Sequence, residues 1–97
     1  MYIANVQTKY EWEDVSELVS AKIGDTFAFS GSATYHITNN SDFPVYLVNT
    51  DTKPSEKDGV GMRLPANSQA DFKPSSSVKL WALSHAGACD LCIEQEN

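Results

Sequence analysis

Short runs of alternating hydrophobic and polar residues, separated by polar turns, recur along the chain. Such runs predict β-strands, because successive side chains of a strand point to opposite faces of its sheet. The expected strands lie at residues 26–30, 34–38, 44–49, 78–83 and 89–94, with weaker runs at 61–64 and 69–72. This spacing predicts an all-β fold, a small antiparallel β-sandwich of about six to eight strands.

The hydrophobic face of these runs defines the expected core. Its members are Phe27, Phe29, Ile37, Leu47, Leu80 and Ile93. The longest polar connection spans residues 49–59, and its charged and turn-forming residues predict a surface loop, the most mobile part of the chain.

The alternation breaks near the N-terminus. Trp12, Val15, Leu18 and Val19 recur at helical spacing. They predict one short helix near residues 12–19 that covers an open end of the sandwich, with a strand as the alternative. Residues 1–11 alternate again, which favours an N-terminal strand or a docking arm that reaches a neighbour. Residues 12–97 then form a single β-sandwich domain.

Two of the expected strands are apolar on both faces. Tyr46 opposes Leu47, and Trp81 opposes Leu80. Such strands need a second cover, which is either the N-terminal segment of the same chain or another subunit. Exposed aromatic patches are typical of protein interfaces. We therefore expect a homo-oligomer with the following contact residues: Tyr2, Ile3, Val6, Tyr46 and Trp81.

The charge balance changes which partners are plausible. Among 97 residues, 7 Lys and Arg stand against 13 Asp and Glu, a formal charge of −6. Nucleic-acid binding depends on clusters of basic residues, so we expect no nucleic-acid partner. The first residues lack the basic and apolar regions of a signal peptide, and no apolar run approaches the roughly 20 residues of a membrane span. We expect a chain made in the cytoplasm, without a membrane partner.

Candidate chemistry is sparse. Cys89 and Cys92 have only His36 and His85 to complete a four-ligand zinc site. On a strand, residues three apart lie roughly 10 Å from each other, beyond the reach of a disulfide. We expect free cysteines, with Cys89 in the core, and no metal or cofactor. Ser84 adjoins His85 on an extended run and cannot share a hydrogen bond with it, so we expect no catalytic residues and no enzyme.

The order of several motifs is distinctive over roughly residues 12–94. It runs Trp12-x-Asp14, Ile23-Gly24-Asp25, Tyr35-x-Ile37-x-Asn39, Pro44-Val45-Tyr46, Gly61-x-x-Leu64 and Leu80-Trp81-Ala82. This order resembles small β-sandwich proteins and modules encoded in the virion structural regions of tailed bacteriophages. The resemblance implies a virion structural protein that self-assembles and docks on a capsid, with no substrate. We expect a head decoration or cement protein, whose partners are its own copies and the phage major capsid protein or another virion protein.

Two alternatives remain open. A small acidic inhibitor or adaptor would bind a basic host protein by mimicking nucleic-acid charge. Its acidic residues would form an extended array. Here residues 1–50 carry six acidic and two basic residues, and residues 51–97 carry seven acidic and five basic residues. A tail-fibre or receptor-binding module would place sugar-stacking aromatics in its loops, and the loop at residues 49–59 has none.

Overall fold

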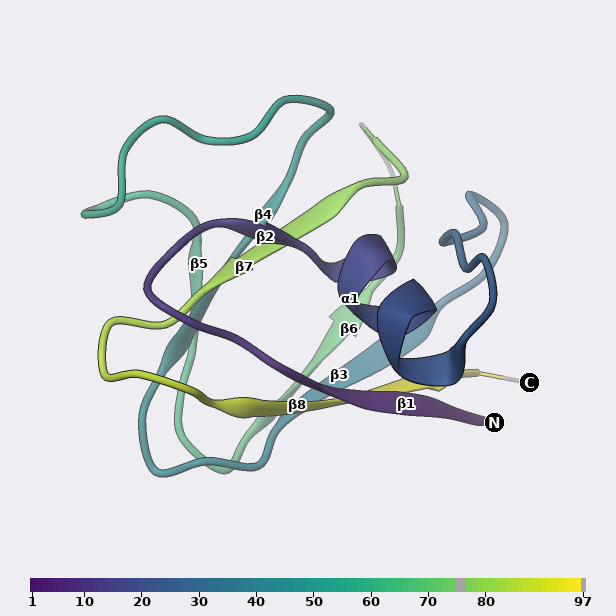
Figure 1. The fold of residues 1–97 in the computed structure, drawn as a ribbon, viewed down its shortest axis with the longest axis horizontal. Helices are drawn as coiled ribbons and strands as arrows, with labels where there is room; N and C mark the ends of the chain where they lie inside the picture. Colours follow the sequence, from purple (N-terminus) through teal and green to yellow (C-terminus); the bar gives the residue numbers. More distant parts are fainter. Residues whose placement is uncertain (75–76, 97) are drawn as a thin grey trace.

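Two antiparallel sheets face each other in the computed structural model, which describes residues 1–74 and 77–96 (Figure 1). The elements are β1 (Tyr2–Gln7), β2 (Glu13–Asp14), α1 (Val15–Ile23), β3 (Tyr35–Asn39), β4 (Val45–Asn49), β5 (Met62–Leu64), β6 (Gln69–Phe72), β7 (Leu80–Leu83) and β8 (Asp90–Gln95). The first sheet has the order β1-β8-β3-β6, and the second has the order β2-β7-β4-β5. The predicted all-β sandwich is therefore confirmed.

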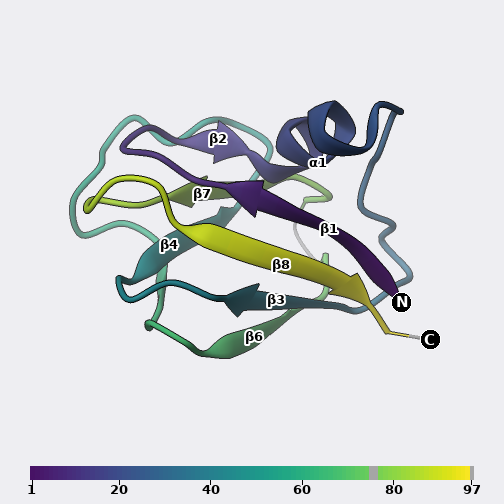
Figure 2. The ribbon, with the colours of Figure 1, turned by 60° about the horizontal axis from the view of Figure 1, so that its bottom comes forward.

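The two sides of the sandwich are closed differently. On one side, α1 lies beside β1 and β2 (Figure 2). On the other side, residues 65–68 connect β5 in the second sheet to β6 in the first, and no helix of the described residues lies beside these two edge strands.

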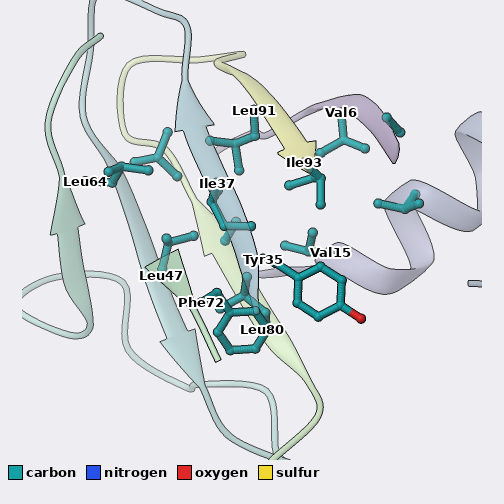
Figure 3. Close-up of a cluster of buried hydrophobic side chains, with 14 of the residues drawn as sticks. Val6, Val15, Tyr35, Ile37, Leu47, Leu64, Phe72, Leu80, Leu91 and Ile93 are labelled. Atoms are coloured by element: carbon teal, nitrogen blue, oxygen red, sulfur yellow. The ribbon is translucent and has the colours of Figure 1, made fainter. Parts of the chain in front are cut away.

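The core fills the space between the sheets and reaches the helix (Figure 3). Its buried side chains include Val6, Ile37, Leu91 and Ile93 from the first sheet, Val45, Leu47, Leu64 and Leu80 from the second, and Val15 and Val19 from α1. Five of the six predicted core residues are buried there. The sixth, Phe27, packs against the core but is only partly buried.

The helix begins three residues later than the start of the predicted segment. Asp14 is its N-cap, with a side chain that accepts a 2.9 Å hydrogen bond from the Ser16 N–H. Gly24 ends the helix in the left-handed conformation at φ 73°. Val15 and Val19 face the core as their spacing predicted, whereas Trp12 lies before β2 and does not share the helical face.

Residues 26–30 form no strand, contrary to the prediction. Side chains satisfy backbone groups there: the Phe27 N–H donates to Ser20 Oγ at 2.8 Å, and the Ser30 N–H donates to Tyr35 Oη at 2.7 Å. Phe29 is buried through edge-to-face contacts, with its ring centroid 4.8 Å from that of Tyr35. Alternation thus identified a buried face without identifying its backbone conformation.

Candidate interaction surface

The residues predicted to contact a partner lie in two separate places. Tyr2, Ile3 and Val6 belong to β1, which pairs with β8 as an edge strand of the first sheet. Residues 2–7 therefore adopt the strand and not the docking arm. Val6 is 3% exposed and lies in the core, so its assignment to an intermolecular surface was wrong.

An irregularity in β1 explains why Tyr2 and Val6 differ. The register with β8 shifts between Tyr2 and Ala4. A bulge of this kind changes the face to which the preceding side chain points. Tyr2 is consequently exposed, Ala4 and Val6 are buried, and Ile3 is partly buried against the core.

Tyr46 and Trp81 lie on the outer face of the second sheet, as the alternation predicted. In the register of β4 with β7, Tyr46 pairs with Leu83 and Val48 pairs with Trp81. We call this the outer apolar face, and it also includes Trp12 from the segment before β2. Leu83 is 0% exposed and Trp12 is 2% exposed, yet neither belongs to the core cluster between the sheets. A second apolar cluster therefore exists outside the sandwich core.

The cover of this outer face comes from residues 50–61, which we call the covering loop. The Trp81 indole N–H donates a 2.9 Å hydrogen bond to the Thr50 carbonyl. The Trp12 indole N–H donates a 2.7 Å hydrogen bond to the Glu56 carbonyl. Each tryptophan thus buries apolar surface while its polar atom binds the loop backbone.

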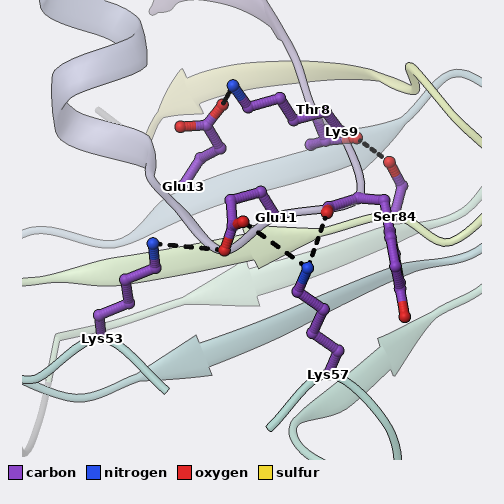
Figure 4. Close-up of polar contacts among 8 residues, drawn as sticks. Thr8, Lys9, Glu11, Glu13, Lys53, Lys57 and Ser84 are labelled. Atoms are coloured by element: carbon purple, nitrogen blue, oxygen red, sulfur yellow. Dashed lines mark hydrogen bonds and ion pairs between the residues drawn. The ribbon is translucent and has the colours of Figure 1, made fainter. Parts of the chain in front are cut away.

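Charged side chains hold the covering loop to the segment before β2 (Figure 4). Lys53 Nζ lies 3.3 Å from Glu11 Oε1, and Lys57 Nζ lies 3.6 Å from Glu11 Oε2. Lys57 Nζ also donates to the Tyr10 carbonyl at 3.3 Å and lies 4.4 Å from the centroid of the Tyr10 ring. The hydrogen bond and charge of Lys53, followed by the charge of Lys57, lower the pKa of the Glu11 carboxyl.

His85 packs at the border of the same surface. Its ring centroid lies 5.2 Å from that of Tyr10 and 5.1 Å from that of Tyr46. Its Nε2 lies 3.0 Å from the Lys57 carbonyl and 3.0 Å from Asp58 Oδ1. The ring therefore joins β4 to the covering loop, a contact that the local sequence pattern around His85 does not indicate.

Ser84 has different partners from its neighbour His85. It is fully buried, accepts a 2.7 Å hydrogen bond from Thr8 Oγ1 and donates to the Gly87 carbonyl. Its hydroxyl thus fixes the β7–β8 connection against the end of β1.

Gly61 closes the covering loop against β4. It has φ +90°, and a Cβ at this position would lie 2.7 Å from the Leu47 carbonyl oxygen and 2.8 Å from Val48 Cγ2. Both the conformation and the close approach require glycine.

The two cysteines are free, as predicted. Cys89 is buried in the core, and Cys92 is partly exposed on the first sheet. Burial, together with the charges of Glu94 and Asp90, raises the pKa of the Cys92 thiol. In the described part of the chain, no group of three or more His, Cys, Asp and Glu side chains is arranged to hold a metal ion.

The covering loop packs on the same face as Tyr46 and Trp81, the residues predicted to contact a partner. The second cover that these strands need comes from their own chain, through residues 50–61 and the segment around Trp12. Both side chains are half-buried, and their contact with a partner stays a prediction. Local sequence patterns do not indicate this arrangement, because Trp12 and Glu56 are 44 residues apart and follow no shared periodicity.

Comparisons with family models, curated proteins and solved structures find no match to this chain. None of the helices in the described residues is long and apolar enough to cross a membrane.

Proposed function

We propose that the chain is a structural protein of a tailed-bacteriophage virion, a head decoration or cement protein that acts by non-covalent docking and self-association. The proposal is supported by the structural roles of the residues that carry the resemblance to phage virion proteins. Trp12 closes the outer apolar face, Gly61 permits the covering loop to approach β4, and Leu80 lies in the core. The resembling motifs therefore coincide with the contacts that define this sandwich.

Asn39 supports the same point. It is fully buried at the end of β3, and its Nδ2 donates to the carbonyls of Phe43 at 2.8 Å and Leu64 at 3.2 Å. Its Oδ1 accepts from the Ser41 N–H at 3.1 Å. One side chain thus joins the turn before β4 to the end of β5. A buried amide with these partners is a costly position to replace, which makes it a meaningful motif residue.

The surface also suits docking. Several large apolar side chains are exposed, among them Tyr2, Phe43 and Met62. The chain carries a formal charge of −6. Acidic charge keeps a free subunit soluble and repels packaged DNA, while edge strands and apolar side chains can be covered in an assembly.

The test is to find the chain in virions of the phage or induced prophage that encodes it. Particles are purified on a density gradient, heads are separated from tails, and peptides are quantified by mass spectrometry against the major capsid protein. We expect the chain in the head fraction at a fixed ratio to the capsid protein. A non-structural phage protein from the same lysate controls for carry-over. Presence in the lysate without enrichment in particles would overturn the proposal, and enrichment in tails alone would exclude the decoration role.

A further inference from the structure

Among the described strands, β6 has the longest edge with neither a strand nor a helix beside it. Within the described residues, β6 pairs with β3 alone and ends the first sheet (Figure 2). At the other end of this sheet, β1 packs against α1. An edge with unpaired backbone groups is a template for pairing with another strand.

The hydrogen bonds of β3 show which backbone groups of β6 face outward. The Asn39 N–H donates to the Ser68 carbonyl at 2.8 Å, so position 68 directs its backbone groups toward β3. Because these directions alternate along an antiparallel ladder, positions 70 and 72 also face β3. The N–H and C=O groups of Asp71 and Lys73 therefore point toward the uncovered edge.

The charges at these two positions fit a second copy of the same edge. If two β6 strands pair antiparallel about a twofold axis at Phe72, Asp71 of each copy lies directly opposite Lys73 of the other. Both side chains are exposed. Opposite charges in directly facing positions stabilise an antiparallel pair, and like charges destabilise it. An axis at Asp71 would instead oppose two carboxylates, so the charges favour the Phe72 register over that one.

An apolar hollow lies beside the same edge. It measures about 200 Å³ and opens between the sheets, lined by Ile37, Leu47, Met62, Ala70, Phe72 and Leu80, among other residues. Met62 is 50% exposed. On the opposite side of the sandwich, Val15 and Val19 of α1 fill the corresponding space between the sheets. A second copy at β6 would cover Met62 and the mouth of the hollow.

We propose that two copies of this chain associate through antiparallel pairing of β6 with β6, centred on Phe72, which joins their first sheets into one continuous sheet. The hydrogen bonds would run between Asp71 of one copy and Lys73 of the other. This inference deepens the self-association in the proposed function, but it does not depend on capsid docking. Oligomeric state is measured on the free protein, so either proposal can fail without the other.

A charge-exchange cycle tests the pairing. Dissociation constants of the full chain are measured by analytical ultracentrifugation. Asp71→Lys and Lys73→Asp each create two like-charge contacts and are expected to weaken association by about tenfold or more. The double variant restores opposite charges and is expected to return to within about threefold of the unmutated chain. Lys73→Asp retains the contact between Asp71 and His36, which lie 2.7 Å apart.

Two controls make each outcome decisive. Asp42→Lys changes the net charge as Asp71→Lys does, at an exposed position outside the strands, and should leave association unchanged. Hydrogen exchange on the unmutated chain should show protection of the Asp71 and Lys73 amides that rises with protein concentration. A monomer at about 100 µM, a dimer without that protection, or a double variant no tighter than the singles would overturn the proposal.

Discussion

The indole N–H of Trp12 lies 2.7 Å from the carbonyl oxygen of Glu56 and donates a hydrogen bond to it. This contact joins the segment before β2 to the middle of the covering loop. Through it, the chain covers the outer apolar face of its own second sheet. The aromatic residues there are covered in part by their own chain, whereas β6 ends the first sheet with no further strand beside it among the described residues.

Replacing Trp12 tests how much this cover stabilises the fold. Trp12→Ala removes a 2%-exposed indole and its hydrogen bond. We expect a loss of about 3–5 kcal/mol in the free energy of unfolding, measured by urea denaturation. Trp12→Phe retains most of the apolar contact and should cost less, with about 1 kcal/mol of its effect from the lost hydrogen bond. An unchanged midpoint in Trp12→Ala would show that the contact between Trp12 and the covering loop contributes nothing to stability.

The glycines of the loop offer a matched pair of variants. Gly61→Ala places a Cβ 2.7 Å from the Leu47 carbonyl oxygen at φ +90°, whereas Gly59→Ala has φ +70° and no atom within 4 Å. In both variants the positive φ should lower the free energy of unfolding by about 1–2 kcal/mol. In Gly61→Ala the clash with β4 should lower it further. Thermal unfolding of both variants measures the difference. Equal losses would mean that Gly61 does not fix the loop on β4.

The fold could be predicted from the sequence where the hydrophobic pattern is local. Alternation over residues 34–38 and 44–49 identified β3 and β4, because one face of each strand must be buried. The spacing of Val15 and Val19 similarly identified the buried side of α1. The prediction of a strand at residues 26–30 was wrong. A buried aromatic face is compatible with an irregular backbone when side chains such as Ser20 accept hydrogen bonds from the backbone N–H groups.

The interaction surface was less predictable because its contacts are long-range. Lys53 and Lys57 bind Glu11 across more than 40 positions, and nothing in residues 49–59 distinguishes an anchored loop from a mobile one. The different burial of Tyr2 and Val6 depended on a register shift between Tyr2 and Ala4 that hydrophobic alternation does not encode. Only the outward direction of Tyr46 and Trp81 followed from local pattern.

The charged contacts of Glu11 make a pH-dependent contribution to stability. Because Lys53 and Lys57 lower the pKa of this carboxyl in the folded chain, its contribution is present above the unfolded pKa and is lost as pH falls through the folded one. We expect the stability difference between the unmutated chain and Glu11→Gln to narrow below about pH 4. Denaturation curves at several pH values measure it, and raising the salt concentration should reduce it at neutral pH. A stability difference between the two proteins that grows as the pH falls would contradict the lowered pKa of Glu11.

The two thiols should differ in reactivity. Cys89 is buried in the core, and Cys92 is partly exposed with a raised pKa. We expect one slowly reacting thiol in the native chain and two in denaturant, measured with a chromogenic disulfide reagent. The native rate should rise with pH, because the thiolate is the nucleophile. Cys92→Ser should abolish the native reaction, whereas Cys89→Ser should leave it. Two fast thiols in the native chain would be inconsistent with the burial of Cys89.

Trp81 distinguishes the interface predicted from sequence from the pairing of β6. Its indole is half-buried, and its N–H donates to the Thr50 carbonyl at 2.9 Å. We expect Trp81→Glu to destabilise the fold by about 2–4 kcal/mol, because it removes apolar contact and places a charge beneath the covering loop. The association constant of the folded fraction should equal that of the unmutated chain, in contrast to Lys73→Asp. Unchanged stability with weaker association would instead place Trp81 between subunits and move the interface from β6 to the outer face of the second sheet.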